Sequence, residues 1–272
     1  MVEALRARGE PVRVWNRTAD KARALERFGA VAAVDALDAV RGASRVHVAV
    51  SDDAAVDSVL ASVDSALDAY TPVIDHSTTS PAGAAARYAK LEARGVPFLH
   101  APVFMSPQAC RDAGGLMLAS GPRKGFDTLE PALRRMTGTL WWVGERADLA
   151  ASLKLFGNTM ILAIVGGVAD ILTLAKSLDI PGEQALSLFE RFKPVTTIEL
   201  RGAKMARGDF SPPSFELAMA RKDLRLMIET AANGDAPLAI VPALASRFDA
   251  LLAQGHGAED VGVLAVDAVK RK

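Results

Sequence analysis

Lys154 and Asn158 stand four residues apart in a segment whose apolar periodicity predicts a long helix. Residues at positions i and i+4 lie on one face of a helix, so both side chains can reach one small polar group. A lysine ammonium in a partly dry cleft has a lowered pKa, which suits a group that gives and takes protons. Taken alone, the spacing is more typical of a surface lysine whose alkyl stem covers apolar residues.

A second set of polar residues follows short apolar runs, where strands are expected to end. Asn16, Arg17 and Thr18 follow the run 12–15, and Lys21 comes one helical turn later. In a dinucleotide-binding fold, an arginine at this point suits the 2′-phosphate of NADP, because its guanidinium offers a planar fork of donors to a dianion. A solvated arginine in a turn is the alternative.

Two more turns carry hydroxyl groups. Val50 and Ser51 end the run 45–50, and Ser77-Thr78-Thr79 follows the run 71–75. Hydroxyls and backbone groups of this kind line a nicotinamide in dinucleotide-binding folds. The same hydroxyls are also common helix caps, so these turns predict a ligand site only in combination with the others.

The elements that position these turns alternate between strand and helix through the first half of the chain. Strands are predicted at 12–15, 45–50, 71–75, 97–103, 116–120 and 140–143, and helices at 1–8, 20–28, 52–60 and 81–94, the last capped by Ser80. This alternation predicts an α/β fold of the doubly wound Rossmann type, with a mostly parallel sheet and helices on both faces. Ligands bind such a sheet beyond the carboxyl ends of its strands.

The second half of the chain has a different pattern. A continuous helix is predicted over 148–178, roughly 45 Å long, which is too long to lie on a small sheet. Further helices are predicted at 182–192, 215–233 and 242–253. We therefore expect a nucleotide-binding domain over 1–147 and an all-α domain over 148–272. The most apolar segment, 160–175, contains Asp170 and is followed by Lys176, which favours a buried helix over a membrane span.

Six motifs in this order resemble the β-hydroxyacid dehydrogenases of the 6-phosphogluconate-dehydrogenase-like superfamily, which includes 3-hydroxyisobutyrate dehydrogenase, glyoxylate/succinic-semialdehyde reductases and imine reductases. The resemblance implies an NAD(P)-dependent oxidoreductase acting on CH–OH groups, with a Rossmann domain, a long interdomain helix and a helical domain used in oligomer formation. The motifs are Asn16-Arg17-Thr18, Asp75-His76-Ser77-Thr78-Thr79-Ser80-Pro81, Ala101-Pro102-Val103, Gly115-Leu116-Met117, the run from Lys154 to Asn158, and Lys222-Asp223.

The resemblance also implies roles for individual residues. Lys154 matches the catalytic lysine, which protonates the nascent alkoxide as hydride arrives, and Asn158 matches the asparagine that orients lysine or substrate. Lys222 matches a lysine that contacts the cofactor near the nicotinamide, although an exposed helix lysine is the alternative. The cofactor-binding residues implied are Asn16, Arg17, Thr18, Lys21, Val50, Ser51, Thr78 and Lys222.

One loop departs from the family pattern. The family usually has Asp-Ala-Pro-Val-Ser-Gly-Gly, a donor-rich loop that holds a substrate carboxylate, where this chain has His100-Ala-Pro-Val-Phe104-Met105-Ser106. Phenylalanine and methionine favour apolar contact instead. The loop therefore predicts a bulkier or less charged carbonyl compound in place of a short hydroxy acid. The substrate-binding residues expected are Ser77, Phe104, Met105 and Ser106.

The beginning of the chain also departs from the family pattern. Residues 1–8 match the first helix of the family, so the first strand and its Gly-x-Gly-x-x-Gly turn are not among the 272 residues. We expect the natural protein to start upstream of Met1. The alternative is a truncated chain with weak or no dinucleotide affinity.

Composition limits the classes of protein to consider. Half of the residues are hydrophobic and 24% are charged, which is ordinary globular composition and excludes wholesale disorder. The 32 basic and 32 acidic residues cancel, which argues against nucleic acid or an anionic membrane as the main partner. Cys110 is the one cysteine of the sequence and is expected to be inert, so a cytoplasmic protein is predicted. No metal-ligand spacing is present.

These observations predict an NADP-dependent oxidoreductase, with NAD as a possible cofactor, that transfers hydride between NADP(H) and a small hydroxy acid or carbonyl compound. Two alternatives remain open. An imine reductase-like activity fits the apolar loop, but such relatives usually replace the lysine. A non-catalytic nucleotide-binding or oligomerisation module has no chemical need for Lys154, Asn158 and Lys222. The expected partners are a small-molecule substrate and further copies of the chain, as a homodimer or homotetramer through the helical domain.

Overall fold

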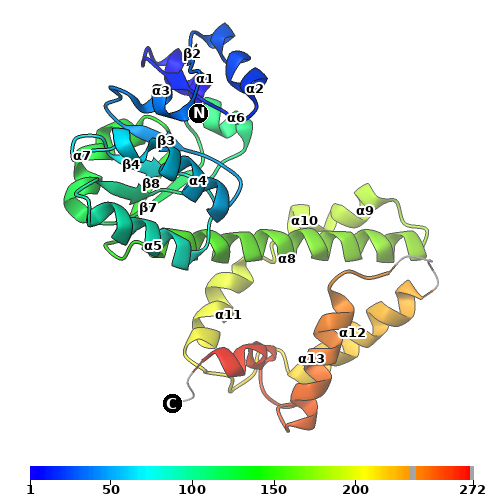
Figure 1. The fold of residues 1–272 in the computed structure, drawn as a ribbon. Helices are drawn as coiled ribbons and strands as arrows, with labels where there is room; N and C mark the ends of the chain where they lie inside the picture. Colours follow the sequence, from blue (N-terminus) through cyan, green and yellow to red (C-terminus); the bar gives the residue numbers. More distant parts are fainter. Residues whose placement is uncertain (233, 235–236, 270–272) are drawn as a thin grey trace. The chain divides into compact units, whose positions relative to one another are not determined.

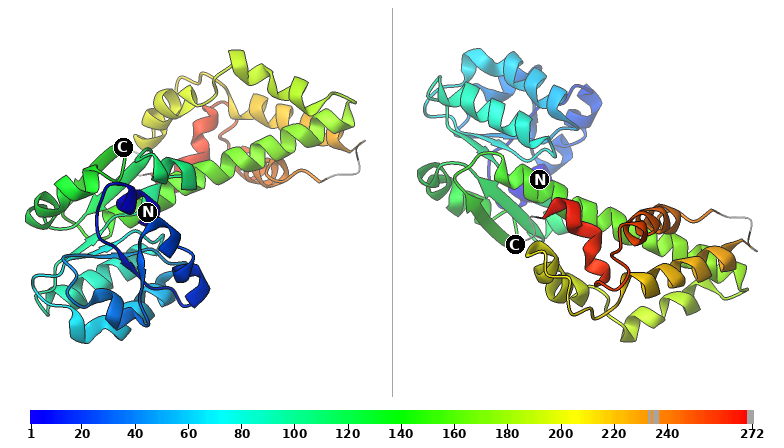
Figure 2. Two further views of the ribbon diagram at one scale, coloured as in Figure 1. Left: turned by 90° about the horizontal axis from the view of Figure 1, so that it is seen from above. Right: turned by 90° about the horizontal axis from the view of Figure 1, so that it is seen from below.

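The computed structural model describes residues 1–232, 234 and 237–269, and Figure 1 labels its helices and strands. The chain divides into two compact units, Met1–Asn158 and Thr159–Lys272. The division falls within helix α8 (Leu149–Ser177), which both further views in Figure 2 show as one uninterrupted helix. The sequence placed the domain boundary at the start of this helix.

The first unit alternates strands and helices, as predicted. Its strands are β1 (Arg13–Val14), β2 (Val31–Ala32), β3 (Val46–Val48), β4 (Val73–Asp75), β5 (Phe98–His100), β6 (Val103–Phe104), β7 (Leu116–Ser120) and β8 (Thr139–Gly144). Its helices before α8 are α1 (Val2–Ala7), α2 (Ala19–Arg23), α3 (Ala36–Val40), α4 (Asp53–Val63), α5 (Pro81–Glu92), α6 (Pro107–Arg111) and α7 (Arg123–Arg134).

The strands form two sheets. Strands β1 and β2 pair in parallel as a small sheet. The larger sheet has the order β3-β4-β5-β7-β6, with β8 beside β7. Its pairs β3–β4, β4–β5 and β7–β8 are parallel, whereas β7 runs antiparallel to both β5 and β6. The predicted α/β class with a mostly parallel sheet is confirmed, and the antiparallel pairs at β7 were not predicted.

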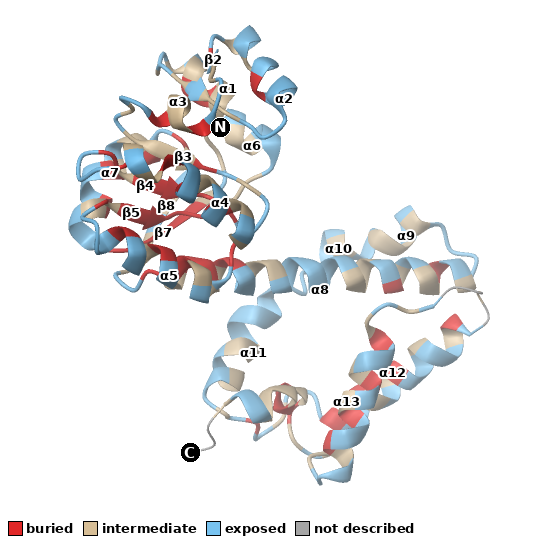
Figure 3. Ribbon diagram, in the orientation of Figure 1, coloured by how far each residue is buried: buried red, intermediate tan, exposed pale blue. Residues whose placement is uncertain are grey.

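The core of the first unit lies on both faces of the larger sheet. All three residues of β4 and of β5 are buried, which Figure 3 shows as red strands between the helices. Parallel strands covered by helices on both faces have this pattern. The cap predicted for α5 is present: the Ser80 hydroxyl accepts from the Gly83 N–H at 3.0 Å, and Pro81 occupies the first turn.

The second unit is helical. It contains most of α8, followed by α9 (Gly182–Leu186), α10 (Leu188–Arg191), α11 (Thr196–Ala206), α12 (Leu217–Ala231), α13 (Val241–Ala253) and the 3₁₀ segment η3 (Val261–Ala268). Buried side chains of α12, α13 and η3, among them Leu217, Leu251 and Val263, form its core. The predicted helix 182–192 is split into two short ones, and α11 was not predicted. The predicted end of α12 at residue 233 lies outside the described residues.

Asp170 explains why a charged residue stands in the apolar stretch of α8. Its buried carboxylate accepts hydrogen bonds from the backbone N–H groups of Ala239, Ile240 and Val241, the last two at 3.0 Å. These are the N–H groups at the start of α13 that no residue of that helix can satisfy. The aspartate of one helix therefore caps the start of another within the second unit.

The prediction that segment 160–175 is a buried helix is wrong for the single chain. Along α8, large apolar side chains such as Leu162 and Val165 are 68% and 59% exposed, and Figure 3 shows much of the helix in pale blue. Apolar residues occur around the whole circumference, so one packed side leaves the others uncovered. By length and composition α8 also meets the requirements of a membrane span, with a mean hydropathy of 1.8 over its most apolar 18 residues.

Candidate active site

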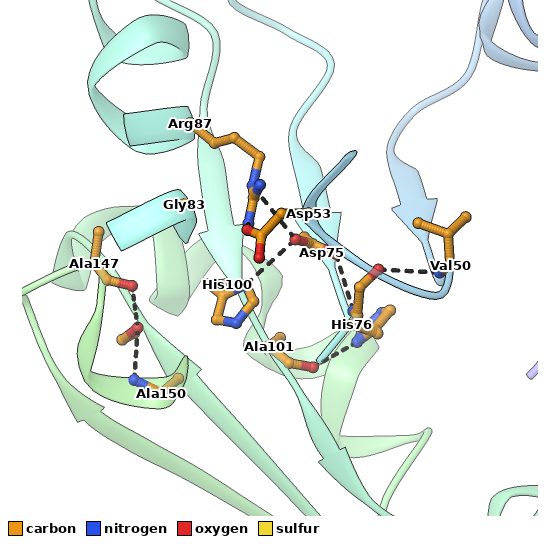
Figure 4. Close-up of polar contacts among 12 residues, drawn as sticks. Val50, Asp53, Asp75, His76, Gly83, Arg87, His100, Ala101, Ala147 and Ala150 are labelled. Atoms are coloured by element: carbon orange, nitrogen blue, oxygen red, sulfur yellow. Dashed lines mark hydrogen bonds and ion pairs between the residues drawn. The ribbon is translucent and has the colours of Figure 1, made fainter. Parts of the chain in front are cut away.

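The first turns of α8 are fixed against the sheet by Ser120, the last residue of β7. Its buried hydroxyl donates to the carbonyl of Ala147 at 2.8 Å and accepts from the N–H of Ala150 at 3.1 Å, as Figure 4 shows. These two hydrogen bonds set where the helix begins. They thereby set the position of Lys154, one turn after Ala150, along the helix axis and the direction in which it leaves the helix.

Lys154 is held inside the first unit by two contacts. Its Nζ donates to the carbonyl oxygen of Val103 at 2.8 Å and lies 3.8 Å from the centroid of the Phe104 ring. The residue is only 9% exposed, and burial lowers the pKa of its ammonium from the ordinary value. An ammonium that is partly stripped of water and held by a neutral carbonyl can release its proton more readily than a surface lysine.

Phe104 is held in place by two glycines. A Cβ atom built on Gly157, one turn after Lys154, would lie 2.3 Å from the Cζ of the Phe104 ring. A Cβ on Gly115 would lie 2.6 Å from the Phe104 carbonyl oxygen, and Gly115 has a φ of +74°, which favours glycine. The missing side chains at both positions let strand β6 and its aromatic ring approach closely.

The other residues predicted to bind substrate lie in two places. Met105 and Ser106 line a cavity of about 320 Å³ with residues of α1 and α6. The Ser106 hydroxyl also caps α6, because its oxygen accepts from the Ala109 N–H at 3.1 Å. Asn158 is half-buried one turn after Lys154. Ser77 lies at the end of β4, described below.

The turn after β1 presents the residues predicted to bind a 2′-phosphate. The Asn16 side chain accepts from the Thr18 N–H at 2.9 Å and so shapes the turn, while Arg17 and Lys21 are exposed. The pKa of Asp52 is held below its usual range by hydrogen bonds from the Ala55 N–H and the Ser51 hydroxyl, and more weakly by the charge of Arg17. The arginine therefore lies near the start of α4, which follows β3.

The turns after β3 and β4 are joined by a hydrogen bond. The Val50 N–H donates to the buried Ser77 hydroxyl at 3.0 Å, and the Ser77 N–H donates to Asp75 at 2.9 Å; Figure 4 shows both contacts. Thr78 is exposed beside them. The Thr79 hydroxyl is buried and has no hydrogen-bond partner among the described residues. The structure thus brings the hydroxyl-bearing turns together, and their part in binding a cofactor stays a prediction.

Sequence reasoning missed a buried polar cluster beneath this edge. Asp75 and His100 are fully buried on neighbouring strands, with the His100 Nδ1 3.4 Å from the Asp75 carboxylate. The Arg87 Nε lies 3.9 Å from the same carboxylate, and the Arg87 guanidinium also pairs with Asp53 at 2.9 Å (Figure 4). Burial alone would raise the pKa of Asp75, but His100 and Ser77 hold it below its usual range.

Two histidines far apart in the sequence are also paired. His47 Nδ1 lies 2.9 Å from His76 Nε2, and His76 Nδ1 lies 2.7 Å from the Ala101 carbonyl oxygen. Since that carbonyl can only accept, His76 donates to it and accepts from His47. Burial lowers the pKa of His76 to about 4, so the pair is neutral near pH 7. The pair ties β3 and β4 to the loop that begins at Ala101.

Lys222 belongs to the second unit. It lies in α12, where its ammonium pairs with Asp223 at 3.0 Å and its side chain is 45% exposed. The cofactor contact that the family resemblance implies for this lysine stays a prediction.

Comparison with known proteins agrees with this geometry. Residues 1–144 match the profile of the NAD-binding domain of 6-phosphogluconate dehydrogenase. The chain is 25% identical over 259 residues to the uncharacterized oxidoreductase YfjR of Bacillus subtilis, covering 94% of this chain and 91% of that protein. It is 27% identical over 240 residues to the human cytokine-like nuclear factor N-PAC, where it spans 42% of the length.

Among solved structures, the fold is similar to that of imine reductases. The imine reductase of Streptomyces aurantiacus superposes with a TM-score of 0.89 at 22% identity, over 99% of this chain and 95% of that one. The imine reductase of Myxococcus stipitatus, in complex with NADP+, gives a TM-score of 0.89 at 20% identity, over 97% and 94%. The chain therefore belongs to the 6-phosphogluconate-dehydrogenase-like family of NAD(P)-binding oxidoreductases.

Proposed function

We propose that this protein is an NADPH-dependent reductase of carbonyl compounds in which Lys154 is the general acid. The observation that carries the proposal is the Lys154 ammonium, buried on α8, held by the Val103 carbonyl at 2.8 Å and lowered in pKa by burial. A structural lysine on a surface helix has no need of such a position. In an oxidoreductase domain, a proton donor of this kind complements hydride transfer.

The described residues fit the ribose and nicotinamide parts of the cofactor, which supplies the hydride when bound. Arg17 and Lys21 are exposed cations at the carboxyl end of β1, where a 2′-phosphate would lie. The joined turns at Val50 and Ser77 offer backbone groups and hydroxyls, and the Thr79 hydroxyl, which has no partner among the residues that the structure describes, is a further donor at this edge. We assign Asn16, Thr18, Ser51 and Thr78 to the same site.

This assignment predicts the cofactor preference. Arg17→Asp is expected to weaken NADPH binding by about 1–3 kcal/mol, because a charge-assisted contact to the 2′-phosphate is replaced by repulsion. NADH binding should change far less, and titration of both cofactors measures the difference. Arg23→Asp, at the end of the helix α2 that follows this turn, serves as the control, since the exposed Arg23 pairs with Asp20. Equal losses of affinity for NADPH and for NADH in the Arg17→Asp variant would contradict the proposed preference for NADP.

The chain's own residues then perform the proton step. As the carbonyl carbon is reduced, Lys154 donates its proton to the developing alkoxide oxygen. In the oxidation direction the neutral amine accepts the hydroxyl proton. Asn158, four residues later on the same face of α8, orients the substrate oxygen or the lysine. The Val103 carbonyl holds Nζ in place between turnovers.

An assay of NADPH oxidation over a panel of aldehydes, ketones and preformed imines tests the proposal. Carbonyl reduction is the expected result. Reduction confined to imines would favour the second candidate, an imine reductase-like enzyme. This candidate is supported by the apolar side chains of Phe104 and Met105 and by the similarity in fold to imine reductases. Cofactor binding without turnover of any compound would favour a non-catalytic module.

We further propose that the exposed apolar face of α8 is covered by a second copy of the chain. Its side chains include Ile161, Leu162, Ile164 and Val165, and a contiguous apolar surface of this kind marks an interface. The capping of α13 by Asp170 gives α8 a protein neighbour and argues against a surrounding of lipid. A cytoplasmic homo-oligomer is therefore proposed.

A double substitution on this face tests the oligomer. Leu162→Glu with Val165→Glu is expected to convert dimers or larger assemblies to monomers, because two charges would have to be desolvated in the interface. Analytical ultracentrifugation of both proteins measures the change. Lys176→Glu, at the exposed end of the same helix, is the control. A parent protein that is monomeric at micromolar concentration would contradict the proposal.

A further inference from the structure

The surroundings of the Lys154 ammonium influence which substrates this lysine can protonate. In the first unit its partners are one neutral oxygen, the Val103 carbonyl, and one aromatic face, that of Phe104. Among the residues that the structure describes, no acidic side chain affects the pKa of Lys154, which burial alone lowers. The ring is positioned by Gly157 and Gly115, which leave room for it and for its backbone, so its place over the ammonium is built into the fold.

An aromatic face is favourable for a cation and unfavourable for an anion. The π-electrons make the face of the ring negative and its edge positive. The face of Phe104 therefore stabilises the lysine ammonium, and the ring covers a side of the ammonium from which a carboxylate could otherwise pair with it. A substrate carboxylate would also have to displace the ring, which lies against the helix at Gly157.

The loop around Phe104 offers few donors to an anion. Its side chains are Val103, Phe104 and Met105, followed by Ser106, whose oxygen accepts as the cap of α6 and whose O–H is the one hydroxyl donor among these four side chains. The cation nearest the loop, the Lys154 ammonium, is already engaged by the Val103 carbonyl and the Phe104 ring, so a carboxylate would lose hydration that these side chains do not replace. An apolar substituent, in contrast, gains by contact with the ring and the methionine.

We propose that Phe104 is a specificity-determining residue that makes the enzyme select uncharged carbonyl compounds, ketones or aldehydes with an apolar substituent, over those that carry a carboxylate near the reacting carbon. This inference rests on the proposed function, because it concerns the substrate of the same lysine. It narrows the substrate class from small hydroxy acids and carbonyl compounds to the uncharged members.

Matched pairs of substrates test the inference by turnover. Succinate semialdehyde is compared with its methyl ester, and glyoxylate with its ethyl ester, with NADPH as reductant. The wild-type enzyme is expected to favour the esters by tenfold or more in kcat/KM. Phe104→Ser should shift the ratio of acid to ester by tenfold or more towards the acid. Phe104→Leu is the matched control, which keeps the apolar volume and should keep the preference for esters.

A binding measurement keeps the inference testable if no substrate is turned over. Isobutyramide and isobutyrate have the same shape and differ in charge, and titration calorimetry measures their binding to the protein–NADPH complex. The wild-type protein is expected to bind the amide more tightly, and Phe104→Ser to gain about tenfold affinity for isobutyrate alone. Melting curves of each variant confirm that it is folded.

The outcomes distinguish the inference about Phe104 from the proposed function of Lys154. Tighter binding or faster turnover of the acids by the wild-type protein overturns the inference, as does binding of neither compound. A Phe104→Ser protein with the wild-type ratio also overturns it. Amide-selective binding that responds to Phe104→Ser, with no reduction of any carbonyl compound, supports the inference about the subsite and contradicts the proposed function.

Discussion

Lys154→Ala is expected to lower kcat for carbonyl reduction by about 10²–10⁴-fold, the range typical of a lost general acid. The developing alkoxide would then have only water as a proton source. NADPH affinity should stay nearly unchanged, because the lysine contacts the Val103 carbonyl and the Phe104 ring and not the cofactor turns. Single-turnover kinetics at saturating NADPH separate this loss from any change in binding.

Lys176→Ala provides the matched control for that substitution. Lys176 is exposed in the last turn of the same helix, so its removal changes the same kind of side chain without touching the site. It should leave kcat within a few-fold of the parent. If Lys154→Ala also retained a rate within a few-fold of the parent, Lys154 would be a structural lysine.

Asp260→Ala is expected to destabilise the second unit by about 2–4 kcal/mol, the cost of removing several hydrogen bonds to one charged group. The carboxylate is 4% exposed and is bonded by Arg201 at 2.9 Å, by the Ser214 hydroxyl at 2.8 Å and by three backbone N–H groups. Removing it leaves these donors without a partner between α11 and η3. Urea unfolding followed by circular dichroism measures the shift.

The same carboxylate predicts how stability depends on pH. Although burial alone would raise the pKa of Asp260, the N–H groups of Gly262 and Ser214 and the Ser214 hydroxyl hold it far below its usual value. A carboxylate whose pKa is lowered on folding stabilises the protein above its unfolded pKa of about 4, and this contribution is lost as the pH falls below that value. Asp260→Ala should abolish this part of the acid sensitivity.

Asp249→Ala is the control for the Asp260 variant. Asp249 is 56% exposed and pairs with Arg221 at the surface, so its loss should change the free energy of unfolding by about 1 kcal/mol or less. Similar effects of the two substitutions would contradict the account of Asp260 as the buried connection between α11 and η3.

Local signals in the sequence predicted much of the fold. Ser80 and Pro81 mark the start of α5, and the apolar run from Leu116 to Ser120 coincides with β7. The antiparallel direction of β7 could not be predicted, because pairing with β5 depends on contacts between His100 and Ser120, which are distant in the sequence. Helix α11 was missed because its β-branched first residues and Gly202 are weak helix formers and none of its residues is buried in the chain.

The site was predictable only in part for the same reason. Lys154 and the turns at Arg17, Val50 and Ser77 follow from motifs that are local in the chain. The pair of His100 with Asp75 joins residues 25 positions apart, and no local pattern relates them. The exposure of α8 in the single chain was mispredicted because hydropathy favours burial of an apolar helix and does not show how much of it the rest of the chain covers.

The pH dependence of single-turnover NADPH oxidation tests the central claim most directly. A general acid with a pKa lowered by burial must be protonated for reduction, so the rate should fall as the pH rises through that pKa, at a pH below the ordinary value of 10.5 for lysine. The oxidation direction should show the opposite slope, and Lys154→Ala should lose this pH dependence together with most of the rate. A wild-type rate that is flat with pH over this range, or a Lys154→Ala protein with the same profile as the parent, would contradict the assignment of Lys154 as the proton donor.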